Sequence, residues 1–211
     1  MKNNTTLYNF ILDRSGSMAG MEELAVNGFN EHLKMIRNLQ IEFPKQEFLC
    51  SLTTFDNEIE TIVPASSIAQ IYPIEVGQYS PRGLTALLDA IGKTIHEVNE
   101  SYQQRIEADE MSVVCVIITD GHENASRFFS YHDIAQKIAM LESTKKWTFT
   151  FIGADFDAIH TSKMLNIKIE NTMNINKANY AGMIDDINEN MHVYSCYKEE
   201  GKIKNKFFSK K

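Results

Sequence analysis

The sequence predicts a doubly wound α/β fold, in which a mostly parallel sheet carries one antiparallel hairpin strand at its edge and helices on both faces. Short apolar runs, such as residues 7–12 and 111–119, alternate with longer segments of helical period. Strands separated by helix-length segments form parallel sheets through right-handed crossovers that cover both faces. A length of 211 residues and a hydrophobic fraction of 43% suit one such domain.

The first third of the chain is predicted to hold three strands and one helix. Residues 7–12 form an apolar run typical of a strand buried on both faces. Residues 21–40 follow as a helix, because apolar side chains recur there at helical spacing. Residues 48–55 and 58–63 are strand-like, and the turn pair Asp56-Asn57 between them predicts the antiparallel hairpin. The helical stripe consists of Leu24, Phe29, Leu33, Ile36 and Gln40.

The middle of the chain has the clearest patterns. The strongest helical period begins at Leu84 and runs to about Tyr102. Residues 111–119 are the most apolar and β-branched segment, as expected for a central strand covered on both faces. Ser130 and Asp133 have the spacing of a capping box, which predicts that a helix begins there.

The last third continues the alternation. Residues 147–152 are predicted to form a strand, residues 159–165 a short helix, and residues 167–169 an edge strand. A final helix is expected from its apolar spacing. Its apolar positions are Met183, Ile184, Ile187, Met191 and Tyr194.

Polar side chains gather at the predicted strand ends. The sequence Asp13-Arg14-Ser15-Gly16-Ser17-Met18 directly follows the first strand and sets one carboxylate and two hydroxyls at alternate positions. Oxygen ligands at this spacing suit a hard divalent cation, although a Ser in such a loop also serves as a helix N-cap. Thr85 opens the long helical pattern, and Asp120 ends the central strand. Each loop with a proposed ligand is expected to follow a strand at the same edge of the sheet, where α/β folds bind ligands.

At these residues the chain resembles the von Willebrand factor type A domain family. Asp13-x-Ser15-x-Ser17, Thr85 and Thr119-Asp120-Gly121 match, in order and rough spacing, the three loops of that family's metal-ion-dependent adhesion site. The resemblance extends from Leu7 to about Tyr194. It implies a Rossmann-like sheet and an intact metal site.

The resemblance also implies a function. The metal ligands would be Asp13, Ser15, Ser17, Thr85 and Asp120, and they would hold Mg²⁺, or Mn²⁺ or Ca²⁺ in its place. Ser15 and Ser17 would bind directly, Thr85 would engage when a ligand is bound, and the two carboxylates would act partly through water. An Asp or Glu of a partner protein would complete the coordination, which makes the chain a metal-dependent adaptor.

Catalysis is the competing function class. A metal-bound water beside two carboxylates could hydrolyse a phosphoester. The alternate position after Asp13 is however Ser15 instead of a second carboxylate, and none of the six His has an evident orienting partner. His122 is the only His in the predicted metal loops, and it is expected to be exposed. We therefore expect no enzyme. The nucleotide-binding motifs G-x-x-x-x-G-K-[ST] and G-x-G-x-x-G are absent from the sequence.

Three further acidic residues lie near the predicted edge. Asp89 is one helical turn after Thr85, where it would either support the metal residues or stand as an exposed helix residue. Asp56 and Asp155 also follow strand-like segments, and we predict turn or cap roles for both.

Charge divides the chain into a domain and a tail. The formal net charge is −7, which disfavours nucleic acid as a partner. Residues 201–211 carry five Lys and no acid. We therefore predict one domain over residues 1–200 and a basic, solvated tail over residues 201–211, with partner contact as the alternative role of the tail.

The three cysteines and the apolar runs indicate a compartment. Cys50, Cys115 and Cys196 are an odd set at wide spacing, and two of them lie in strand-like runs, which predicts buried thiols instead of a disulfide framework. No apolar run is long enough for a membrane span, and the polar N-terminus does not have the pattern of a secretion signal. A cytoplasmic protein is expected.

Overall fold

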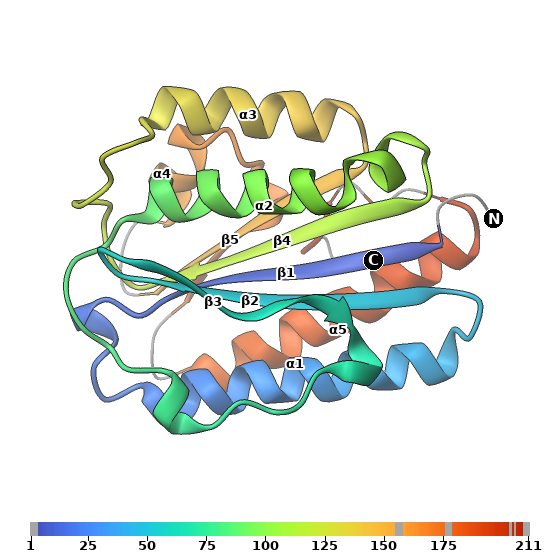
Figure 1. The fold of residues 1–211 in the computed structure, drawn as a ribbon, viewed down its shortest axis with the longest axis horizontal. Coiled ribbons are helices and arrows are strands. Elements are labelled where there is room, and N and C mark those ends of the chain that lie inside the picture. The colour runs from blue at the N-terminus through green and yellow to red at the C-terminus, as the bar shows by residue number, and fades with distance from the viewer. Residues whose placement is uncertain (1–3, 155–157, 176–178, 203, 205, 209–211) are drawn as a thin grey trace.

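The computed structural model describes residues 4–154, 158–175, 179–202, 204 and 206–208. One six-stranded sheet forms the middle layer of the fold (Figure 1), in the order β3-β2-β1-β4-β5-β6. All neighbouring strands are parallel except β2 and β3, which form the predicted antiparallel hairpin. The strands are β1 (Thr5–Asp13), β2 (Glu47–Phe55), β3 (Ile59–Ser67), β4 (Met111–Thr119), β5 (Trp147–Ala154) and β6 (Thr172–Ile175).

Helices cover both faces of the sheet, as Figure 1 shows. On one face lie α1 (Glu22–Glu42) and α5 (Tyr180–Glu199). On the other face lie α2 (Leu87–Glu107), α3 (Tyr131–Ser143) and α4 (Ala158–Met164). Short 3₁₀ turns, η1 (Gly16–Met18), η2 (Ile68–Gln70), η3 (Val76–Gln78) and η4 (Ile169–Asn171), lie in the connections. The predicted fold class is therefore confirmed.

The strand sequences explain the three layers. Every residue of β1 and β4 is buried, because helices cover both faces of these central strands. Along β1, Tyr8 and Phe10 belong to the core beneath α1 and α5, whereas Leu7 and Ile11 belong to the core beneath α2 and α3. The predicted capping box of Ser130 and Asp133 is present at the start of α3.

Three local predictions differ from the structure. The first helical residue of α2 is Leu87, so Thr85 precedes the helix, and Leu84 is 55% exposed instead of packed in the core. Leu24 of α1 is likewise exposed. The last strand is Thr172–Ile175, and the predicted edge strand at 167–169 is wrong, because this segment runs into the turn η4.

The loop that carries Thr85 does not follow a strand end. Strand β3 runs antiparallel to β2. It therefore ends where β1 and β2 begin, far from the carboxyl ends of the parallel strands. Residues 68–86 return along the side of the domain to reach the start of α2 (Figure 1). The sequence-based expectation that every ligand loop directly follows a strand is correct for Asp13 and Asp120 and wrong for Thr85.

Part of the predicted basic tail packs against the domain. Phe207 is fully buried in the core beneath α1 and α5, and its backbone N–H donates to Asn171 Oδ1 at 2.6 Å. Lys206 pairs with Glu170 at 3.1 Å. The expectation of a solvated tail is thus wrong for these residues, since an aromatic side chain anchors them. The limits of the domain remain a prediction.

A buried lysine lies at the amino end of β1, whereas Asp13 lies at the carboxyl end of this strand. Lys198 of α5 is 7% exposed, and its ammonium donates to Thr5 O at 2.5 Å, Thr6 Oγ1 at 2.7 Å and Ser112 Oγ at 2.8 Å. Burial lowers the pKa of Lys198 from 10.5 to about 7, and Asp109 opposes that shift. The charged form is therefore disfavoured in the folded protein.

This lysine makes stability depend on pH. Between pH values of about 7 and 10.5 the unfolded chain binds a proton at Lys198 that the native protein does not hold, so the free energy of unfolding rises with pH. We expect this residue to contribute a slope of at most about 1.4 kcal/mol per pH unit. Lys198→Met should remove that contribution. Urea denaturation of both proteins across this range measures the difference in slope, and parallel curves would contradict the account.

Candidate metal centre

Asp13 lies at the end of the central strand β1 and is fully buried. Its Oδ1 accepts a hydrogen bond from the backbone N–H of Ser15 at 2.6 Å, and its Oδ2 accepts one from Thr119 Oγ1 of β4 at 2.5 Å. The hydroxyl of Tyr79, from the segment that returns to α2, donates to the carbonyl oxygen of Asp13 at 2.5 Å. Asp13 therefore joins three separate parts of the chain.

The environment of Asp13 disfavours its negative charge. Burial raises the pKa of Asp13 to about 6, the hydrogen bonds from Thr119 and Ser15 oppose this, and the nearby Asp120 adds a smaller increase. An opposite charge within hydrogen-bonding range would favour the ionised carboxylate. A cation bound beside Asp13 would therefore oppose the effect of burial on this pKa.

Ser15, Ser17 and Asp120 lie beside Asp13 as the sequence predicts. The hydroxyls of Ser15 and Ser17 are 3.1 Å apart, and Ser17 Oγ donates to Asp120 Oδ1 at 2.6 Å. The turn η1 brings the serines back over the end of β1, while Asp120 follows β4 directly. Because β1 and β4 are parallel neighbours, their carboxyl ends meet at this edge.

Distances from an added Cβ atom at Gly121 show how close Thr85 lies to Ser17 and Asp13. A Cβ atom added at Gly121 would lie 2.9 Å from Thr85 Oγ1, 3.4 Å from Ser17 Oγ and 3.6 Å from Asp13 Oδ2. Oxygens from the loop after β1 and from the segment before α2 therefore face one small space beside Gly121. We refer to Asp13, Ser15, Ser17, Thr85 and Asp120 as the oxygen cluster.

Hydrogen bonds donated by backbone N–H groups hold the loop after β4 against the start of α2. The backbone N–H of Thr85 donates to Asn124 Oδ1 at 2.8 Å, and the N–H of Asn124 donates to Thr85 O at 3.0 Å. Glu123 accepts from the N–H groups of Leu88 at 3.0 Å and Ser126 at 2.7 Å. These contacts fix Thr85 relative to Asp120.

Asp89 supports the same loop and is 6% exposed. Its carboxylate accepts hydrogen bonds from three consecutive backbone N–H groups, those of Arg127 at 2.7 Å and of Phe128 and Phe129 at 3.0 Å. Of the two roles considered for Asp89, support of the loop therefore agrees with the geometry. It does not face the oxygen cluster as a ligand, since its two oxygens bind this backbone.

Asp56 has a structural role outside the oxygen cluster. It accepts a hydrogen bond from the backbone N–H of Glu58 at 2.5 Å, as a turn residue does, and its buried Oδ2 pairs with Arg14 at 3.2 Å and Arg82 at 2.9 Å. The guanidinium of Arg14 is thereby directed to the hairpin.

His122 is exposed, as predicted. Asp155 lies outside the described residues.

The donor set of the oxygen cluster fits a hard cation. It contains two carboxylates and three hydroxyls, and hard divalent cations prefer such oxygens. Within the described part of the chain, no three His, Cys, Asp or Glu side chains gather in a way that could hold a metal ion. A transition-metal centre of His and Cys ligands is therefore not formed by these residues, and the oxygen cluster is the candidate centre.

The family comparison agrees with this fold and with the positions of these loops. The family model described as the von Willebrand factor type A domain matches residues 9–190. The chain belongs to this family. Its members generally mediate protein–protein interaction. Comparison with curated protein sequences finds no significant match.

Solved structures of this family share the fold. Proximal thread matrix protein 1 from the mussel byssus is 15% identical, with a TM-score of 0.59 over 89% of this chain and 46% of that chain. The ArnB paralog VWA2 from Sulfolobus acidocaldarius is 19% identical, with a TM-score of 0.54 over 89% of this chain and 45% of that one. The chain thus spans about half the length of these proteins.

A third structure is similar over nearly its whole length. The von Willebrand factor domain of the pili tip protein Mfa5 from Porphyromonas gingivalis is 10% identical, with a TM-score of 0.60 over 92% of this chain and 96% of that chain.

Among the described residues, no helix is long and apolar enough to cross a membrane.

Asp89 gives the first testable prediction for this centre. Asp89→Ala should leave three backbone N–H groups without their acceptor, which lowers the free energy of unfolding by about 1–3 kcal/mol. Amide hydrogen exchange at residues 127–129 should become faster. Asp133→Ala is the matched control, because it removes the acceptor of Ser130 N–H in the α3 capping box. Unchanged exchange at 127–129 in Asp89→Ala would contradict the supporting role.

Proposed function

We propose that the chain is a metal-dependent protein-binding domain whose oxygen cluster holds a divalent cation. The observation that supports this most directly is the convergence of oxygens on the space above Gly121, where Thr85, Ser17 and Asp13 all lie within 3.6 Å of a single added atom. Two segments far apart in sequence supply these oxygens, and Gly121 lies on a third, next to Asp120. A fold does not need hydroxyls and carboxylates to meet in this way, whereas a cation does.

The oxygen cluster would offer the ion two kinds of ligand. Asp13 and Asp120 would supply the negative charge, and the hydroxyls of Ser15, Ser17 and Thr85 would supply neutral oxygens. Mg²⁺ takes octahedral oxygen coordination at about 2.0–2.1 Å and keeps several waters, and Mn²⁺ or Ca²⁺ are the alternatives. With two carboxylates the ion keeps an affinity for a further anionic oxygen. An Asp or Glu side chain of a partner protein is the donor that we propose.

Features of the family and of the chain support this proposal. Another structure of the mussel protein is described as having a zinc-occupied MIDAS motif, which is the metal-ion-dependent adhesion site. The three cysteines of this chain are free thiols, which suits a reducing compartment, so a cytoplasmic location belongs to the proposal. Phosphoester hydrolysis with the same carboxylates is the alternative function.

Removal of one carboxylate tests the proposal. Asp120→Asn keeps the shape of the side chain but lacks its charge, so Mn²⁺ affinity measured by calorimetry should fall at least about tenfold. Asp186→Asn, on the exposed side of α5, is the matched control and should bind normally. A partner captured with Mg²⁺ should be lost with chelator and with Asp120→Asn. Wild-type Mn²⁺ affinity in Asp120→Asn would show that the ligand assignment is wrong.

A steric substitution tests the same space without changing a ligand. Gly121→Ala places a Cβ atom 2.9 Å from Thr85 Oγ1, while every carboxylate and hydroxyl of the oxygen cluster is kept. The backbone of Gly121 is outside the left-handed region, so alanine is compatible with its conformation. We expect weaker Mn²⁺ binding with circular dichroism unchanged.

The control for this substitution is Gly77→Ala, whose added Cβ meets nothing within 4 Å. Equal Mn²⁺ affinity in Gly121→Ala and Gly77→Ala would mean that the ion does not occupy the space above Gly121.

A further inference from the structure

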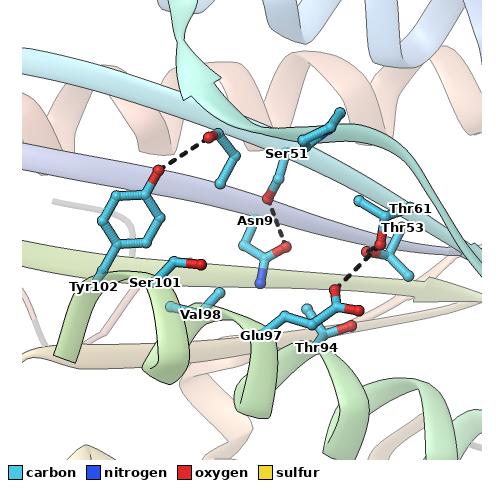
Figure 2. Close-up of a pocket in the computed structure, with 11 residues that line it drawn as sticks. Asn9, Ser51, Thr53, Thr61, Thr94, Glu97, Val98, Ser101 and Tyr102 are labelled. Atoms are coloured by element: carbon cyan, nitrogen blue, oxygen red, sulfur yellow. Dashed lines mark hydrogen bonds between the residues drawn. The ribbon is translucent and has the colours of Figure 1, made fainter.

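A pocket of about 350 Å³ lies between α2 and the sheet, apart from the oxygen cluster. Figure 2 shows its two walls, with Asn9, Ser51 and Thr53 on the sheet and Glu97, Val98 and Tyr102 on the helix. Its volume is at the lower end of the range for small-molecule sites, which is roughly 300–1,000 Å³. The remaining lining residues are Thr61, Pro64, Ala65, Thr94 and Ser101.

The floor of the pocket interrupts an apolar sheet face. Leu7, Ile11, Leu49 and Phe55 on β1 and β2 all belong to the core beneath α2 and α3. At the positions between them stand polar residues, since Asn9 and Ser51 are register partners and Thr53 follows on the same face. All three are at most 5% exposed. These buried polar side chains depart from the rule that core positions are apolar. Such departures are expected at functional sites.

The carboxamide of Asn9 has unused hydrogen-bonding capacity. Its Oδ1 accepts from Ser51 Oγ at 2.8 Å, and its Nδ2 donates only to the thiol of Cys115 at 3.9 Å. A thiol is a weak acceptor, and an amide nitrogen has two N–H groups to donate. Asn9 is 1% exposed, so only the edge of its carboxamide reaches the pocket. A water molecule in the pocket, or a ligand oxygen that displaces it, would accept the second N–H.

The mouth of the pocket carries a carboxylate. Glu97 Oε2 accepts from Thr61 Oγ1 at 3.2 Å, and the side chain of Glu97 is 40% exposed. Lys93 lies 3.7 Å from Glu97 Oε1 and also donates to Ile59 O, so it only partly balances this charge. No basic residue lines the pocket. The charge therefore favours a cationic ligand and disfavours an anionic one.

We propose that this pocket binds a small amino alcohol or a related amine that also carries a hydroxyl. The hydroxyl end accepts a hydrogen bond from Asn9 Nδ2 and exchanges bonds with the hydroxyls of Ser51 and Thr53. The ammonium end pairs with Glu97, and the carbon chain packs against Val98 and Pro64. This site is independent of the metal centre, since no residue of the oxygen cluster lines it.

Three compounds with one carbon chain length test the chemistry of the ligand. Aminobutanol, butanediol and hydroxybutyrate share a hydroxyl end and differ in the other end, which is an ammonium, a hydroxyl or a carboxylate. Backbone amide NMR titration of the full chain reports binding at Asn9 and Ser51. We expect saturable shifts with aminobutanol, binding roughly tenfold weaker with butanediol, and none with hydroxybutyrate.

Variants on α2 separate the pocket from the general surface. Glu97→Gln should remove the preference for aminobutanol over butanediol, and Ser101→Phe should block the pocket entrance and abolish the shifts. Glu100→Gln is the matched control, because Glu100 pairs with His96 at 3.5 Å and does not line the pocket. Asp120→Asn should bind aminobutanol normally, which distinguishes this site from the metal centre.

Several results would overturn the proposal. Absence of shifts at Asn9 and Ser51 with all three compounds would mean that the pocket takes no ligand of this class. Equal binding of hydroxybutyrate, or of butanediol, would contradict the role of Glu97. Shifts that spread over exposed carboxylates and persist in Ser101→Phe would show only surface binding of the amine.

Discussion

The buried carboxylate of Asp13 is the constraint on which the arrangement of the strand ends depends. A carboxylate so far from water is costly unless donors or a cation surround it. The fold provides donors from the loop after β1 and from β4, and Tyr79 binds the backbone carbonyl of the same residue. The returning segment 68–86 is thereby attached to the end of β1. Asn124 then holds Thr85, near the end of this segment, beside Asp120.

The sequence predicts the central elements and the strand-end positions of Asp13 and Asp120 because their signals are local. Residues 111–119 were expected as a strand and are β4, since a short, apolar and mostly β-branched run is typical of a strand covered on both faces. Asp13 and Asp120 can be predicted because each comes directly after an apolar run of this kind. The position of Thr85 before α2, the strand at Thr172–Ile175 and the burial of Phe207 depend on tertiary packing, and no local pattern contains them.

Supporting residues are also hard to foresee from the sequence. Asp89 looks like a helix residue on either reading, and only the folded chain reveals that residues 127–129 place three N–H groups at its carboxylate. The same holds for Asn9, whose place on β1 is predicted although its polar neighbours are not. Ser51 comes from the adjacent strand β2 and Glu97 from α2, so the pocket exists only after the sheet and the helix have packed.

The central claim is that the oxygen cluster holds a divalent cation. A crystal structure of the protein grown with Mn²⁺, with anomalous diffraction recorded at the manganese edge, tests this claim most directly. The account predicts one strong anomalous peak above Gly121, within coordination distance of Ser15 and Ser17 and adjacent to the carboxylates of Asp13 and Asp120. A protein crystallised in saturating Mn²⁺ without a peak at this position, or with its peak elsewhere, would contradict the account.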